Sequence, residues 1–152
     1  MTENHEENFE KPSIDPESYG LPKVIIEIQQ PKKESKGTFK SQKLIIKNEQ
    51  NEEIGTATLN ISSPKKGEAS AYLNTINIKE ELRGRGYGKS AYLEIIKLLG
   101  SVKLKSGFGL SRGTKKIWDW LLLNGLARKL DEGIVDEATE NAGYSSAEYE
   151  II

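Results

Sequence analysis

The feature that most constrains the fold of this 152-residue chain is a change of hydrophobic period on either side of a glycine-rich stretch. Residues 69–78 alternate apolar and polar side chains, as a half-buried β-strand does. Residues 84–88 then include three glycines, and apolar residues recur at helical spacing over 89–99. The sequence therefore predicts a strand, a tight loop and a long amphipathic helix in direct succession.

Patterns on both sides of this unit predict the remaining elements. Segments that are β-branched or alternate in polarity are typical of strands, and a second helical period begins near Ser111 and ends at Gly125. We expect six further strands, at 24–28, 44–47, 54–61, 102–105, 126–130 and 147–152. The order strands, helix, strand, helix, strands predicts a mixed α/β (α+β) fold, with a mainly antiparallel sheet flanked by helices.

The composition excludes several kinds of chemistry. The chain has no cysteine, which excludes disulfides, thiolate metal sites and a cysteine nucleophile. The only histidine, His5, lies near the amino terminus, so we expect neither an imidazole zinc site nor a serine–histidine triad in the core. No apolar run approaches the length of a membrane span, and the first thirty residues lack the pattern of a secretory signal. We expect no metal, no membrane partner and a cytoplasmic location.

Charge is segregated along the chain. Residues 1–22 hold six acids, one lysine and three prolines, which predicts an acidic flexible tail before a single domain at 23–152. Residues 131–152 hold seven acids and no base, so residues 23–130 carry a net charge of +11. A basic body of this kind suggests an anionic ligand, whether nucleotide, coenzyme or nucleic acid.

The glycine loop (residues 83–90) is the part of the chain best suited to bind a phosphate group. Glycine lets a backbone approach phosphate oxygens closely, and amides at the start of a helix point at an anion. Two phosphate-loop patterns do not fit. The Walker A pattern needs a glycine where Arg83 stands, and the third glycine of the dinucleotide fingerprint falls on Lys89.

A third pattern fits without adjustment. Arg83-x-x-Gly86-x-Gly88 matches the (R/Q)-x-x-G-x-(G/A) loop of the GNAT (general control non-repressible related) N-acetyltransferase superfamily, which the chain resembles over roughly residues 40–152. In that family a hydrophobic residue five positions before the arginine ends the preceding strand, and Ile78 holds that place here. The resemblance implies a V-shaped split between two central strands.

The resemblance also implies a site for acetyl-CoA in that split. The loop amides would bind the pyrophosphate, the strand before the loop would pair with the pantetheine arm, and the helix beginning near Ser111 would flank that arm. The implied cofactor-binding residues are Ile76, Asn77, Ile78, Arg83, Gly84, Arg85, Gly86, Tyr87, Gly88, Lys89 and Ser90.

The reaction implied is N-acetyl transfer from acetyl-CoA to an amine by direct attack, with a protein, peptide or small-molecule acceptor. Many family members place a catalytic glutamate where this chain has Tyr72, which we take as the candidate catalytic residue. Many also place a proton-donating tyrosine where this chain has Leu121. These departures leave an alternative open, a CoA-binding module that senses or interacts without catalysis.

A nucleic-acid-binding domain is the third interpretation. The basic body favours it, but the acidic ends would oppose phosphate, and the chain lacks a recognition-helix pattern, so nucleic acid is the least favoured partner. A homodimer is compatible with the sequence, which does not identify the amine acceptor.

Overall fold

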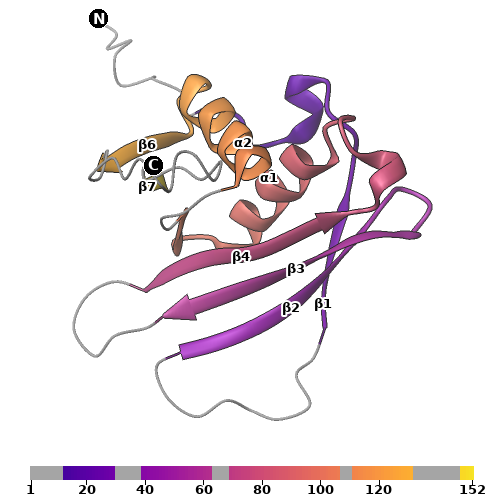
Figure 1. Cartoon of the computed structure of the whole chain (residues 1–152), viewed down its shortest axis with the longest axis horizontal. Helices are drawn as coiled ribbons and strands as arrows, with labels where there is room; N and C mark the ends of the chain where they lie inside the picture. Colours follow the sequence, from indigo (N-terminus) through magenta and orange to yellow (C-terminus); the bar gives the residue numbers. More distant parts are fainter. Residues whose placement is uncertain (1–11, 30–38, 63–68, 107–110, 132–147) are drawn as a thin grey trace, which may run out of the picture.

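The computed structural model describes residues 12–29, 39–62, 69–106, 111–131 and 148–152. Within these ranges seven strands form one sheet in the order β1-β2-β3-β4-β5-β7-β6 (Figure 1). The strands are β1 Ile25–Ile28, β2 Phe39–Lys47, β3 Glu53–Ser62, β4 Ser70–Ile78, β5 Lys103–Lys105, β6 Ala127–Asp131 and β7 Glu148–Ile151. The helices are α1 Tyr87–Leu99 and α2 Arg112–Leu123, with short 3-10 turns η2 Pro16–Tyr19 and η3 Glu80–Leu82.

One pair of neighbouring strands differs from all the others. The neighbours in the sheet are antiparallel except β4 and β5, which are parallel and pair only over Ser70–Tyr72 with Lys103–Lys105. The rest of β4, residues 73–78, has no register partner on β5. The register between β3 and β4 also shifts, leaving Asn74 as an extra residue between two paired positions. The predicted mixed, mainly antiparallel sheet with a split between two central strands is confirmed.

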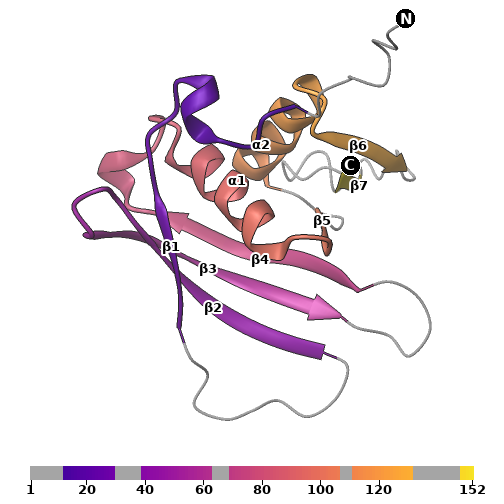
Figure 2. The same ribbon diagram turned by 180° about the vertical axis from the view of Figure 1, so that it is seen from behind.

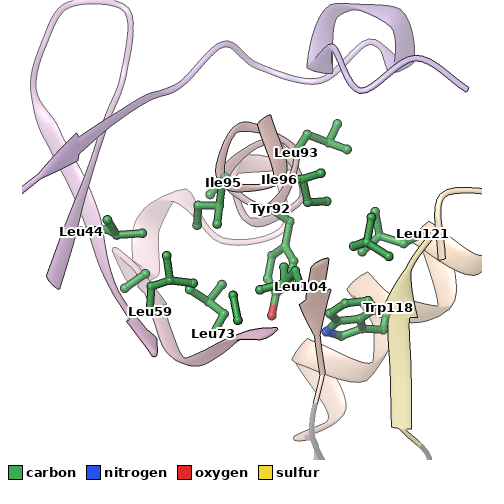
Figure 3. Packing of buried hydrophobic residues seen from close by; sticks show 14 of the residues in the cluster. Leu44, Leu59, Leu73, Tyr92, Leu93, Ile95, Ile96, Leu104, Trp118 and Leu121 are labelled. Atoms are coloured by element: carbon green, nitrogen blue, oxygen red, sulfur yellow. The ribbon is translucent and has the colours of Figure 1, made fainter. Parts of the chain in front are cut away.

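Both helices cover the same face of the sheet (Figures 1 and 2). Leu59 and Leu73 of the neighbouring strands β3 and β4 are buried below α1, from which Tyr92 points toward the sheet (Figure 3). Trp118 of α2 meets the Tyr92 ring edge-on and stacks on Tyr149 of β7, with centroids 5.9 Å apart in each case. This aromatic group joins α1, α2 and the β6–β7 pair into one core. No helix in the described ranges is long and apolar enough to cross a membrane.

Residues 12–24 form an N-terminal strap that lies on the helices (Figure 2). The Ser90 hydroxyl, fully buried in the first turns of α1, donates a 2.6 Å hydrogen bond to the Pro22 carbonyl. Near the other end of α1, the Lys97 ammonium lies 2.6 Å from an Asp15 carboxylate oxygen. The strap is therefore attached to both ends of the same helix.

The prediction of a flexible tail over residues 1–22 is wrong for residues 12–22. Three apolar side chains of this stretch pack on the core, namely Ile14, Tyr19 and Leu21. Pro16 between them is buried. The high content of acid and proline concealed these apolar groups, because each stands alone rather than in a periodic run. Residues 1–11 lie outside the described ranges.

Candidate functional site

A cavity of about 560 Å³ lies where β4, the glycine loop and the start of α2 meet. Its described lining residues come from these three places: Ile76, Asn77, Ile78, Leu82, Arg83, Gly84, Gly86, Tyr87, Gly88, Lys89, Ser111, Gly113, Thr114, Lys116 and Ile117. This volume is in the usual range for a small-molecule or coenzyme site.

The start of α1 leaves polar backbone groups at this cavity. Gly86 precedes the helix with a φ of 91°, and no side chain caps the helix there. The amide of Ser90 is the first to bond within the helix, to the Gly86 carbonyl at 3.0 Å. The three amides before it, at residues 87–89, have no acceptor inside the helix. Together with the helix dipole, they make this end of α1 a favourable place for an anion.

Cations add to this positive potential. Arg83 donates from Nε to the Ile78 carbonyl at 2.9 Å, which holds the guanidinium beside the end of β4. The Lys89 ammonium lies 5.1 Å from the centroid of a Trp120 ring. Lys116 contributes a third cation from α2. The described lining residues include no carboxylate, so the cavity suits a ligand with several negative charges.

The open edge of β4 supplies backbone hydrogen-bonding groups. The Lys79 amide donates to the Ile54 carbonyl of β3 at 2.9 Å. Backbone groups of successive strand residues point in alternate directions, so those of Ile76 and Ile78 point away from β3. They face the side where β4 has no partner on β5. An extended ligand lying there could bond to β4 as an added strand does.

The structure brings together most of the residues predicted to bind a cofactor. Nine of the eleven line the cavity; the exceptions are Arg85, which is exposed, and Ser90, which is buried and bonded to the strap. The first two turns of α2 also line it, as expected for a helix beginning near Ser111. The sequence did not indicate a binding role for Gly113, Thr114, Lys116 and Ile117, because nothing in their local pattern distinguishes them from any helix start.

Tyr72, the predicted catalytic residue, lies at the vertex of the split. It pairs with Lys105, the last register pair before β4 and β5 separate. Its side chain is half-buried and is not among the described residues that line the cavity. Its neighbours Ala71 and Leu73 are buried, so the alternation of a strand places Tyr72 on the opposite face of the sheet.

A buried carboxylate lies across β5 from Tyr72. Glu150 pairs in register with Lys105 and accepts a 2.7 Å hydrogen bond from Arg128. Burial opposes its ionisation, but the hydrogen bond and the charge of Arg128, with Lys105 nearby, outweigh this and lower its pKa. Glu150 is therefore an ionised structural partner and a poor candidate for a general base at neutral pH. No group of three or more histidine, aspartate or glutamate side chains in the described ranges could hold a metal ion.

Comparisons with known proteins identify the fold. No family model matches the chain, and no curated protein matches it in sequence. Among solved structures, a chimera of spermidine N-acetyltransferase SpeG from Vibrio cholerae and hSSAT aligns with a TM-score of 0.53 at 12% identity, over 74% of this chain and 67% of that one. A second such chimera gives 0.51 at 13% identity, over 74% and 68%.

A further match, at a TM-score of 0.48 and 14% identity, is a histone acetyltransferase HPA2-related acetyltransferase from Corynebacterium glutamicum. The alignment covers 73% of this chain and 62% of that protein, so the chain spans somewhat less than two thirds of its length. The two chimeras align with TM-scores above 0.5, and at this low sequence identity the alignments show a shared fold. The GNAT-like fold that the sequence resemblance implied is confirmed.

Proposed function

We propose that this protein is an N-acetyltransferase that transfers the acetyl group of acetyl-CoA to an amine. The observation that carries the proposal is the convergence, on one cavity, of the open end of β4, the uncapped start of α1 and three cations. A pyrophosphate needs the second and third of these features, and an extended amide-bearing arm needs the first. The fold shared with solved acetyltransferases also supports the proposal.

Each part of the cavity has a role in this proposal. The amides of the glycine loop, with Arg83 and Lys89, bind the pyrophosphate, and Lys116 reaches the same anion from α2. The backbone of Ile76 and Ile78 binds the pantetheine arm along the open edge. Arg85 contributes charge from the exposed rim, and Ser90 supports the loop from behind through its bond to Pro22.

The chemistry that the coenzyme supplies is an activated acetyl thioester. The amine nitrogen forms a bond to the carbonyl carbon, the carbon–sulfur bond breaks, the amine loses a proton and the CoA thiolate gains one. The protein contributes chiefly by orienting the two reactants, which can provide much of the rate enhancement. We propose Tyr72, at the vertex of the split, as the group that relays the amine proton: its hydroxyl oxygen receives that proton, directly or through water, while its own hydroxyl proton passes to solvent.

One observation favours the alternative of a CoA-binding module without catalysis. Leu121 occupies the place where many GNAT members carry the proton-donating tyrosine, and it is completely buried in the core. A leucine cannot protonate a thiolate, so any transfer here would need another proton donor.

Calorimetric titration with CoA and acetyl-CoA is the first test. The wild type should bind with a dissociation constant in the micromolar range, and Lys116→Met should weaken binding about tenfold by removing one cation from the cavity wall. Lys43→Met is the matched control, because Lys43 is exposed on β2, away from the cavity, and this variant should bind like the wild type. No binding of either ligand at millimolar concentration would refute the proposal.

Turnover separates the enzyme from the binding module. Release of free CoA thiol from acetyl-CoA would be followed with a panel of acceptors, including peptide amines, lysine side chains and polyamines. Amine-dependent release that Tyr72→Phe reduces at least tenfold would support both the activity and the role of Tyr72. Tight binding with no amine-dependent release would favour the alternative.

A further inference from the structure

A chain of ring contacts links the N-terminal strap to the cavity between β4, the glycine loop and α2, which is called the anion cavity from here on. The Tyr19 ring meets Trp120 of α2 edge-on, with centroids 5.1 Å apart and an interplanar angle of 74°. The Lys89 ammonium lies over a Trp120 ring, 5.1 Å from its centroid. Lys89 belongs to the first turn of α1 and lines the cavity. A strap residue therefore acts on a cavity cation through one intervening indole.

Each contact has a favourable geometry. An edge-to-face aromatic pair prefers centroids roughly 4.5–7 Å apart, and a cation within about 6 Å of an indole centroid is attracted to its face. Trp120 is half-buried, so its position depends on what packs against it, and Tyr19 packs from the strap side. The Tyr19 hydroxyl donates to the Ser13 carbonyl, which fixes the tyrosine within the strap.

The strap also contacts the glycine loop itself. A Cβ atom on Gly86 would lie 2.8 Å from a methyl of Leu21 and 3.3 Å from Cδ of Pro22. These distances mean that the strap is packed against the loop at Gly86, and neither Leu21 nor Pro22 is among the described residues that line the cavity. The strap therefore holds both the backbone and one cation of the candidate anion site.

We propose that Tyr19 and Trp120 are positioning residues for the coenzyme site. Tyr19 fixes the Trp120 indole, and the indole holds the Lys89 ammonium at the cavity wall, where it meets a phosphate group of the bound coenzyme. A lysine held in this way loses less conformational entropy on binding than a free one. The inference rests on the proposed function, because the phosphate belongs to the proposed ligand.

Binding and strap docking are consequently coupled. If the docked strap raises the affinity for coenzyme, coenzyme must stabilise the docked strap by the same factor. Saturating CoA should therefore slow proteolytic cleavage within residues 12–24 in the wild type.

A double-mutant cycle tests the route through Lys89. We expect Tyr19→Ala to weaken CoA binding about three- to tenfold in calorimetric titrations. Tyr19→Phe should bind almost as the wild type does, because it keeps the ring. In a Lys89→Met background, Tyr19→Ala should have almost no further effect, since the group that it positions is gone. Ser18→Ala is the control within the strap, because the exposed Ser18 hydroxyl bonds to the Ser13 hydroxyl and is no part of the Tyr19–Trp120 ring contact, and it should leave affinity unchanged.

A second measurement does not need the coenzyme. The ε-methylene group of Lys89 is bonded to the ammonium that lies over the indole, so its protons should resonate upfield of those of other lysines in the NMR spectrum of the ligand-free protein. Tyr19→Ala should move them toward the ordinary lysine position, and Tyr19→Phe should not.

The outcomes separate the inference from the proposed function. If the wild type binds CoA but Tyr19→Ala weakens binding equally with and without Lys89, Tyr19 has only a structural role, and the inference is refuted while the proposed function stands. An unchanged Lys89 resonance in Tyr19→Ala also overturns it, whether or not CoA binds. If CoA does not bind but the resonance moves, the proposed function fails, as does the coenzyme role of this contact.

Discussion

Gly113 offers a way to close the anion cavity without disturbing the fold. It is the second residue of α2 and lines the cavity, and a Cβ atom built on it would meet nothing within 4 Å. We predict that Gly113→Glu folds at least as stably as the wild type and binds CoA far more weakly. Replacing glycine in a helix stabilises by about 0.5–1 kcal/mol, and a carboxylate in the first turn is favoured by the helix dipole.

The expected loss of affinity follows from the size of the cavity. A sphere of about 560 Å³ has a radius of about 5 Å, so a carboxylate at the wall lies about 5 Å from an anion at the centre. Two unit charges at that distance repel by about 3 kcal/mol at an effective dielectric constant of about 20, and by about half of that at 40. Because about 1.4 kcal/mol corresponds to a factor of ten, affinity should fall about 10- to 200-fold.

The assay is calorimetric titration with CoA at low ionic strength, with thermal unfolding measured in parallel. Gly113→Gln is the matched control, because it has the same size without the charge and should bind within about threefold of the wild type. Raising the salt concentration should reduce the difference between the two variants, since the repulsion is screened. Equal binding by a well-folded Gly113→Glu protein would refute the assignment of the cavity to an anion.

Three further predictions concern stability and are measured by urea denaturation. Ser90→Ala should lower the free energy of unfolding by about 1–2 kcal/mol, because it leaves a partly buried strap carbonyl without its donor; an unchanged midpoint would contradict this. Gly86→Ala should cost about 2 kcal/mol and Gly84→Ala about 1, because both glycines have positive φ but only the first is packed against the strap; equal losses would show that the packing is unimportant. Arg128→Met should cost about 1 kcal/mol at pH 7, a modest value because Arg128 is largely exposed. The pKa of Glu150 is lower in the folded state than in the unfolded one. The stabilisation by Arg128 is therefore present above the unfolded pKa and is lost as pH falls through the folded pKa. If Arg128→Met lowered the free energy of unfolding as much at pH 2 as at pH 7, this origin would be contradicted.

The sequence predicted the order and type of the regular elements well. The strand at 69–78 and the helix at 89–99 have unmistakable periods, and the structure moves their limits by only one or two residues. The second strand, expected at 44–47, begins at Phe39 instead. After Phe39, its first half is polar (residues 40–43), and such residues form a strand because each of them has a register partner on β3. Pairing across the sheet is a tertiary effect that a local pattern does not contain.

The candidate site was predictable only in part, for the same reason. The glycine loop is contiguous in sequence, so its pattern could be recognised, and the loop does line the cavity. The contributions of Lys116 and Gly113 come from a helix that begins more than twenty residues later, and only the fold brings them there. The packing of the strap could not be predicted from composition, because it depends on single contacts between side chains, such as that of Tyr19 with Trp120.

The short parallel pairing of β4 with β5 has a consequence for how the protein folds and unfolds. Strands β1–β4 follow one another along the chain, and each pairs with the next in an antiparallel register. By contrast, only three parallel register pairs link β4 to β5, through which β7 and β6 join the sheet. The junction between these two halves therefore depends mostly on side chains, chiefly the rings of Tyr92, Trp118 and Tyr149. The two halves of the sheet should behave as separate cooperative units in native-state hydrogen exchange, with the meander as the earlier-forming one. The gap in the backbone ladder between β4 and β5, where we propose that the coenzyme binds, is thus also expected to be the boundary between two folding units.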